Sequence, residues 1–359
     1  MEQFSEAWAA AGAAFKSGDL HADLAPVKWG LTAFLGGNEP GRDGKVIVKL
    51  REIIDRRARQ IATDQGVALH EAKGRAIAQY AGTTAAGKNA RAAMLKMLYH
   101  LYMGGSTKSQ VVWVYSPPKV YSKWIFSVVK NLTTDAALAA ELGKDDEAVY
   151  SPSQRATITK AVQTGKDLCL NAAARTARSN DITLDLVRNY FSTNATADRQ
   201  LSTVASRLAK GFQLMAGMLN RGVVVISDEP KDRQAGGWSD FAFAYVGEDM
   251  CVIYVQGAML AKIDDYNGGD QRSLIRAART VVHETSHKVL HTSDVIYGSS
   301  GGLRPEGSAD LTPEFAMSNA DSWAYFCVEL NGRLRPGAMA RARTAAGAIR
   351  AAPSRALLV

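Results

Sequence analysis

Residues 283–287 read His-Glu-Thr-Ser-His, and this short segment constrains the chain more than any other feature of its sequence. Residues four apart lie one above the other on the same face of an α-helix. Two imidazoles placed in this way, those of His283 and His287, can bind one zinc ion at about 2.0–2.1 Å. Glu284 follows the first histidine, where its carboxylate can reach a water molecule on that ion. The segment therefore predicts one Zn²⁺ per chain, bound on a helix.

The flanking sequence supports this interpretation. Apolar side chains recur at helical spacing before the motif, which predicts a helix with a buried face. They are Leu274, Ile275, Ala278, Val281 and Val282. Residues 251–255, Cys-Val-Ile-Tyr-Val, predict a buried strand ahead of that helix. A strand followed by an H-E-x-x-H helix is the layout of a zincin active site.

A catalytic zinc ion needs a third protein ligand and one open position. His291 lies about 6 Å farther along the helix axis, at 1.5 Å per residue, and would miss the metal. The metzincin layout requires glycine and histidine where this chain has Leu290 and Ser293. Glu306 and Glu314 remain as distant candidates. Asp294 is favoured, because a turn after the helix would return its carboxylate to the metal.

Three motifs in one order resemble the aspzincin, or deuterolysin-like, metallopeptidases. They are His283-Glu-Thr-Ser-His287, Thr292-Ser-Asp-Val-Ile-Tyr-Gly298 and Asn319-Ala-Asp-Ser-Trp-Ala-Tyr-Phe326. The resemblance covers about residues 152–332. It implies a zinc endopeptidase with His283, His287 and Asp294 as ligands, Glu284 as general base and Tyr297 as oxyanion stabiliser.

Asp321 has two interpretations. Some lysine-specific aspzincins carry acidic residues on this helix that contact the lysine of the substrate, and Asp321 resembles one of them. A second acid is expected one turn later, where this chain has Ala324. The alternative is a carboxylate that supports a metal ligand or caps the helix. The sequence leaves both roles open, and Asp321 is retained as a candidate substrate-binding residue.

The predicted fold class is α+β. Residues 1–150 are expected to form a mainly helical N-terminal domain of unknown role. Residues 151–332 are expected to form a zincin-like domain, with helices packed on a small, mostly antiparallel sheet. Its strands are predicted within residues 222–226, 241–246 and 251–255. Residues 333–359 form a basic Ala/Arg-rich tail, interpreted as a weakly ordered appendage.

Charge and composition restrict the partners. The net charge is +8, but the tail holds six arginines and no acid, so the remaining residues carry only +2. A nearly neutral body gives no electrostatic basis for nucleic-acid binding, so no nucleic acid is expected, and a protein or peptide is the predicted substrate. No apolar run approaches 18 residues, so no transmembrane helix is expected. The three cysteines are odd in number and widely spaced, which favours free buried thiols.

The sequence also bears on cellular role. Its first residues lack the basic and apolar regions of a secretory signal, which predicts synthesis in the cytoplasm without a cleaved signal peptide. An added helical half beside a zinc hydrolase half fits an exported bacterial toxin effector, with a secretion machine or an immunity protein as partner. Two alternatives stay open: a zinc amidohydrolase acting on peptidoglycan peptides, and a non-catalytic, zinc-stabilised binding module.

Overall fold

The computed structural model describes residues 3–17, 20–36, 41, 44–81, 85–104, 112–115, 121, 123, 128, 132, 134–143, 149–220, 224–227, 233, 236–248, 250–299 and 301–346. The chain divides into two compact units, which are described separately. The first consists of Met1–Ala156, Gly222–Ser239 and Glu248–Val252, and the second of Thr157–Arg221, Asp240–Gly247 and Ile253–Val359.

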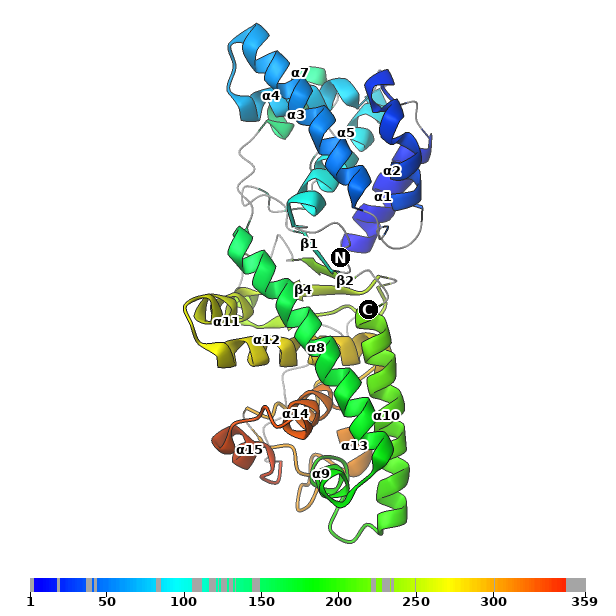
Figure 1. Cartoon of the computed structure of the whole chain (residues 1–359), viewed down its shortest axis with the longest axis vertical. Coiled ribbons are helices and arrows are strands. Elements are labelled where there is room, and N and C mark those ends of the chain that lie inside the picture. The colour runs from blue at the N-terminus through cyan, green and yellow to red at the C-terminus, as the bar shows by residue number, and fades with distance from the viewer. Residues whose placement is uncertain are drawn as a thin grey trace. The chain divides into compact units, whose positions relative to one another are not determined.

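The described part of the first unit is mainly helical. Its elements are α1 (Phe4–Ser17), η1 (Ala22–Val27), α2 (Lys28–Phe34), α3 (Lys45–Gln65), α4 (Leu69–Tyr80), α5 (Ala85–Gly104), β1 (Val112–Val114), α7 (Asp135–Leu142), β2 (Val224–Ser227) and η3 (Gly236–Ser239). Figure 1 shows helices α1 to α5 of this unit in blue to cyan. The long helix α3 buries one side, through residues such as Ile47, Leu50 and Ile54. The alternation of apolar and charged residues in this stretch is thus that of an amphipathic helix.

Aromatic rings connect the helices of the first unit to its strand β1. Phe34 of α2 has its ring centroid 5.8 Å from that of Trp8 in α1 and 5.2 Å from that of Trp113 in β1. Phe4 approaches Tyr115 with centroids 5.1 Å apart. These rings are buried, so they supply a large apolar area to the core of this unit.

The strand predicted within residues 222–226 lies in a different unit from the one expected. It is β2, and it pairs in parallel with β1 in the register Val112↔Val224 and Val114↔Ile226. The sequence analysis placed it in the second domain, residues 151–332. Pairing between residues more than a hundred positions apart leaves no local signal, so the sequence could not predict this partner.

The second unit holds most of α8 (Pro152–Arg178) and most of β4 (Val252–Val255). It also holds α9 (Asp181–Phe191), α10 (Asp198–Asn220), β3 (Ala242–Phe243), α11 (Gly257–Asn267), α12 (Gln271–Leu290), α13 (Pro313–Ser318), α14 (Ala320–Leu330) and α15 (Pro336–Ala342). Strands β3 and β4 are antiparallel, with Ala242 opposite Val255. Helices beside a small antiparallel pair are consistent with the α+β class, although the parallel β1–β2 pair departs from a mostly antiparallel sheet.

Helix α14 forms the centre of the second unit, because every one of its residues is buried. Its sequence is apolar on almost all sides, as expected for a helix enclosed by others. Phe326 packs against Phe191 of α9 and Phe212 of α10, with ring centroids 5.3 Å and 5.9 Å apart. Gly211 lets α10 approach closely, since a Cβ atom there would lie 2.5 Å from the Trp323 ring. The helix that begins with Asn319 and Asp321 is therefore held rigidly.

Two expectations from composition agree with the structure. Cys169, Cys251 and Cys327 are buried and free, as the sequence predicted. None of the helices in the described part of the chain combines the length and the apolar character needed to cross a bilayer.

The first part of the basic tail corrects the sequence interpretation. Residues 333–346 are packed into the second unit rather than forming an appendage, and residues 347–359 lie outside the described part of the chain. Ala342 is fully buried, and its carbonyl accepts a hydrogen bond from Leu303 N at 2.8 Å. Arg343 donates through Nε to the buried Glu329 carboxylate at 2.8 Å. The composition suggested disorder because it does not reveal this buried acid 14 residues earlier.

Arg343→Ala should lower the free energy of unfolding of the protein by about 1–3 kcal/mol, because a buried carboxylate would lose a charged hydrogen bond. Tyr190 also donates to Glu329, but its neutral hydroxyl cannot replace the cation. Arg333→Ala is the matched control, since Arg333 is exposed and forms no ion pair among the described residues. Urea unfolding monitored by fluorescence measures both changes. Equal stability of the two variants would contradict this role.

Candidate metal centre

Helix α12 presents the histidines and ends where the chain must turn back. Asp270 caps its N-terminus, because the Asp270 carboxylate accepts hydrogen bonds from Arg272 N at 3.1 Å and Ser273 Oγ at 2.8 Å. The helix ends at Leu290, and the C-cap residue His291 adopts the left-handed conformation with φ 54° and ψ 38°. The change of backbone direction at His291 starts the turn that brings Asp294 back to the helix.

Three side chains converge as the sequence predicted. The Nε2 atoms of His283 and His287 lie 3.2 Å apart. The Oδ1 atom of Asp294 lies 2.9 Å from His283 Nε2 and 3.4 Å from His287 Nε2. Among the described residues, these three form the one group of histidine and acidic ligand atoms close enough to hold a metal ion.

The separations fit a zinc ion. Tetrahedral ligands at about 2.0–2.1 Å from zinc are separated from one another by roughly 3.3 Å. The three distances between ligand atoms fall around that value. Two imidazole nitrogens and one carboxylate oxygen are also the ligand types that zinc accepts, and three protein ligands are typical of catalytic sites. The residues present therefore fit the predicted metal.

Hydrogen bonds at the other ring nitrogens fix how the imidazoles are oriented. His283 Nδ1 lies 2.7 Å from Asp321 Oδ1, and His287 Nδ1 lies 2.7 Å from the carbonyl oxygen of Thr292. A carboxylate and a carbonyl can only accept, so each Nδ1 carries the proton that it donates. In the neutral form of each imidazole, Nε2 then carries a lone pair, and both lone pairs are directed at the same place. This is the usual support of a metal-binding histidine.

The charges of the ligands are tightly coupled. Burial opposes the charged form of His283, but the hydrogen bonds that its ring donates to Asp294 and Asp321 raise its pKa well above the usual value. The pKa of His287 is raised as well, against burial, by its hydrogen bond with Asp294. Burial favours the neutral form of Asp294, yet the two imidazoles hold the pKa of its carboxyl well below the ordinary range. A carboxylate thus stays ionised between two histidines, as a metal ligand requires.

Glu284 lies beside the convergent atoms with a free oxygen. Its side chain is buried, and its Oε1 is 4.0 Å from His283 Nε2. Its Oε2 is also buried and has no hydrogen-bond partner among the described residues. A buried carboxylate oxygen is costly without a donor, so this atom fits a water molecule held at the metal. Burial raises the pKa of Glu284, which moves it toward the range useful for a general base.

Tyr297 faces the same centre. Its ring lies nearly parallel to that of His283, with centroids 6.3 Å apart and planes inclined by 23°. Burial and a hydrogen bond with Asp294 raise the pKa of its hydroxyl group. The hydroxyl therefore stays protonated and can donate a hydrogen bond close to the metal ligands.

The loop that carries Asp294 and Tyr297 is held by the start of α14, and the sequence did not predict how. Asn319 Oδ1 accepts from Val295 N at 3.0 Å and from Ile296 N at 3.2 Å. The Ser293 backbone also bonds to residues 318 and 320, by Ser293 N to Ser318 O at 2.7 Å and Ala320 N to Ser293 O at 3.0 Å. The Asn-Ala-Asp motif marked this helix, but only the fold shows that Asn319 holds the loop.

Asp321 supports a ligand in this structure. Its Oδ1 accepts from His283 Nδ1, and its Oδ2 accepts from Gly298 N at 2.8 Å. The residue is 8% exposed, so little of the carboxylate is accessible to a substrate. Ala324, where a second acid was expected, is fully buried. The contacts therefore favour the supporting role over the substrate-binding role that the sequence also allowed.

The other candidate ligands lie elsewhere. His291 is exposed and ends the helix. Glu306 Oε2 accepts from Asn194 N at 2.7 Å, and Glu314 lies in the first turn of α13. The helix-axis argument against His291 agrees with its place outside the group of convergent atoms.

Comparison with known proteins supports the same assignment. Residues 176–328 match the aspzincin family model, described as lysine-specific metallo-endopeptidase. The resemblance to aspzincins is confirmed over these residues. No curated protein and no solved structure matches the chain. The matched segment includes every ligand and support of the candidate centre, and it supports a zinc metallopeptidase.

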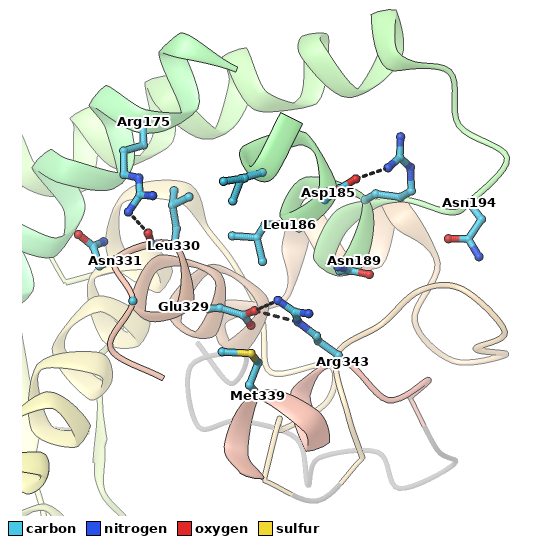
Figure 2. A pocket seen from close by; sticks show the side chains of 13 residues that line it. Arg175, Asp185, Leu186, Asn189, Asn194, Glu329, Leu330, Asn331, Met339 and Arg343 are labelled. Atoms are coloured by element: carbon cyan, nitrogen blue, oxygen red, sulfur yellow. Dashed lines mark hydrogen bonds and ion pairs between the residues drawn. The ribbon is translucent and has the colours of Figure 1, made fainter. Parts of the chain in front are cut away.

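A separate cavity lies in the same unit, between α9, α14 and α15 (Figure 2). Its volume is about 570 Å³, and Arg175, Asp185 and Arg343 are among the residues that line it. Figure 2 shows Glu329 between α14 and the Arg343 side chain, which pairs with it. No residue of the candidate metal centre lines this cavity. The chemistry is therefore assigned from the convergent ligands and not from cavity size.

Asp294→Ala should reduce zinc affinity by at least about a hundredfold, because it removes one of three direct ligands. His291→Ala is the matched control and should retain zinc, since the imidazole of His291 lies outside the centre. Metal content after dialysis against a graded zinc buffer measures both. Equal zinc loss in the two variants would contradict Asp294 as the third ligand.

Asp321→Ala should weaken zinc binding by about 10- to 100-fold, the usual effect of removing a group that orients a histidine ligand. Asp321→Asn should lose less, because its amide oxygen can still accept from His283 Nδ1. Competition with a chromogenic chelator measures both affinities. If both variants bind zinc as the wild type does, Asp321 does not orient the ligand.

Proposed function

We propose that this chain is a zinc-dependent endopeptidase. The observation that carries the proposal is the convergence of His283 Nε2, His287 Nε2 and Asp294 Oδ1. Beside them lies the buried Glu284 Oε2, which has no hydrogen-bond partner within the described part of the chain. The family match supports a peptidase, and the site supplies the groups that peptide hydrolysis needs. When bound, zinc supplies Lewis acidity to the reacting carbonyl and water.

Glu284 is the general base in this proposal. Its carboxylate takes the proton of the water that attacks the scissile carbonyl carbon and then gives this proton to the leaving amine. Burial raises the pKa of Glu284, and Oε2 has no competing donor among the described residues. The base is thus held ready beside the ligands.

Tyr297 stabilises the developing negative charge. Its hydroxyl stays protonated near the ligands and can donate to the oxyanion that forms from the scissile carbonyl. Removing one donor of this kind typically slows turnover about 10²–10³-fold. Asn319 and Asp321 contribute by holding the loop on which Tyr297 lies.

The alternatives from the sequence remain distinguishable. A binding module stabilised by zinc would usually have four protein ligands, whereas three converge here among the described residues. An amidohydrolase would share the same chemistry and differ only in substrate. Export as a toxin effector stays a prediction from the sequence.

Glu284→Gln should reduce hydrolysis of an unfolded protein by about 10²–10⁴-fold, because the proton acceptor is lost while the size is kept. The variant should still hold about one zinc ion per chain, since Glu284 is not a ligand. Casein and purified peptidoglycan are assayed in parallel, with product ends identified by mass spectrometry. Cleavage of peptidoglycan alone would favour the amidohydrolase, and a fully active variant would contradict the role of Glu284.

A further inference from the structure

Three arginines continue the line of the metal-binding histidines along helix α12. At 3.6 residues per turn, Arg272, Arg276, Arg279, His283 and His287 all fall within an arc of about 80° on the helix surface. The arginines thus occupy the helix turns immediately before the histidines, on the same side. We call Arg272, Arg276 and Arg279 the arginine stripe.

The arginine stripe lies on the solvent side of α12. Leu274, Ala277, Ala278 and Val281 point the other way and are buried. Arg272 is exposed, and Arg276 and Arg279 are half-buried. The burial pattern therefore leaves the guanidinium groups accessible in the half of the helix that precedes the metal centre.

Arg279 connects the stripe to the centre itself. It precedes His283 by one helical turn, about 6 Å along the axis. Its guanidinium lies over the Tyr325 ring, 4.2 Å from the centroid. Tyr325 follows Asp321, the carboxylate that holds His283, by four residues on α14. The Arg279 side chain therefore packs against the helix that supports a zinc ligand.

No stripe arginine forms a salt bridge among the described residues, where the ion pairs near α11 and α12 are Lys262–Asp265 and those of the metal-centre histidines. Asp270 and Asp321 nevertheless lie near enough to interact electrostatically with Arg276 and Arg279. Asp270 at the start of the helix is the acid nearest in sequence, and its carboxylate already accepts from Ser273 Oγ and Arg272 N. Arg335 and the stripe residue Arg276 both interact electrostatically with that acid, and Arg341 interacts with Tyr325, so the neighbouring elements add positive charge beside the stripe.

The length of the stripe matches a short peptide. Arg272 and His283 are 11 residues apart, which corresponds to about 16 Å along the helix. An extended chain covers this distance with about five residues. Side chains of a bound peptide on one side of the scissile bond would therefore pass the arginines in succession.

We propose that the arginine stripe selects acidic substrates: the preferred peptide carries Asp or Glu within about five residues of the scissile bond, on one side of it. This inference rests on the proposed endopeptidase function. The proposed preference differs from the lysine specificity in the family description. Both carboxylate oxygens of Asp321 already accept hydrogen bonds, from His283 and Gly298, so Asp321 is poorly placed to bind a substrate lysine.

The test compares matched peptides that differ only in charge. One neutral parent peptide is extended with three Glu or three Gln residues, placed before or after the scissile bond. For one of the two placements, the wild type should show a kcat/KM about five- to tenfold higher with Glu than with Gln, as expected for a few exposed ion pairs. This preference should decline from 0.05 to 0.5 M NaCl, because exposed charges are screened.

The double variant Arg272→Gln/Arg276→Gln should lose most of this preference, and the corresponding double Lys variant should retain most of it. These two arginines are chosen because Arg279 packs on Tyr325, and its removal could disturb the fold. Arg199→Gln/Arg207→Gln is the matched control: both residues are exposed on α10, and the preference should be unchanged. A preference for Lys, no preference for acid, or a preference that persists in the stripe variant would overturn the inference.

Binding is measured separately so that the two proposals can fail independently. Glu284→Gln, loaded with zinc, should bind the fluorescein-labelled Glu peptide more tightly than the Gln peptide by about the same factor, with the same loss in the stripe variant. If this binding preference is found but no peptide is cut, the stripe stands and the endopeptidase proposal fails. If peptides are cut without charge preference in either assay, the endopeptidase stands and the stripe proposal fails.

Discussion

The hydrogen bond between Asp321 and His283 is the contact on which the arrangement of the site depends. Through one oxygen, Asp321 orients a metal ligand on α12, and through the other it holds Gly298 N, next to Tyr297. Asn319, two residues earlier, holds the loop just after Asp294. The start of α14 thus fixes the ligands relative to the oxyanion donor. The buried packing of α14 supplies the rigidity that such positioning needs.

The sequence predicted the candidate metal ligands better than it predicted which residues far apart in the chain contact one another. The spacing of His283 and His287 predicts a shared metal, because the geometry of one helix sets it. The rise per residue excluded His291, and a turn after the helix, together with the aspzincin resemblance, favoured Asp294 over Glu306 and Glu314. The role of Asn319 was not predictable, because its acceptor oxygen serves a loop more than 20 residues earlier. The same limit applies to β2, whose partner lies in another part of the chain.

The C-terminal segment 333–346 shows a second limit of prediction from sequence, which concerns composition. An Ala- and Arg-rich segment is typical of disorder, and composition alone gives no reason to expect residues 333–346 inside a fold. The deciding partner is Glu329, an acid buried at the end of α14. A buried carboxylate needs a cation and hydrogen bonds, and Arg343 and Tyr190 supply them. Arg343 therefore has a structural role, and this role can be recognised only once Glu329 is known to be buried.

The complete burial of α14 also limits how the specificity of this protein can change. Ala324, the position one turn after Asp321, is surrounded by the core of the second unit. An acid introduced there would be placed among apolar side chains, where its charge is strongly disfavoured. An acidic substitution at position 324 would therefore destabilise the folded protein, so lysine recognition is not expected to arise by that single change. The exposed side of α12 carries no such penalty, so changes of substrate preference in this lineage are expected to accumulate on α12 and its neighbours, while α14 varies little.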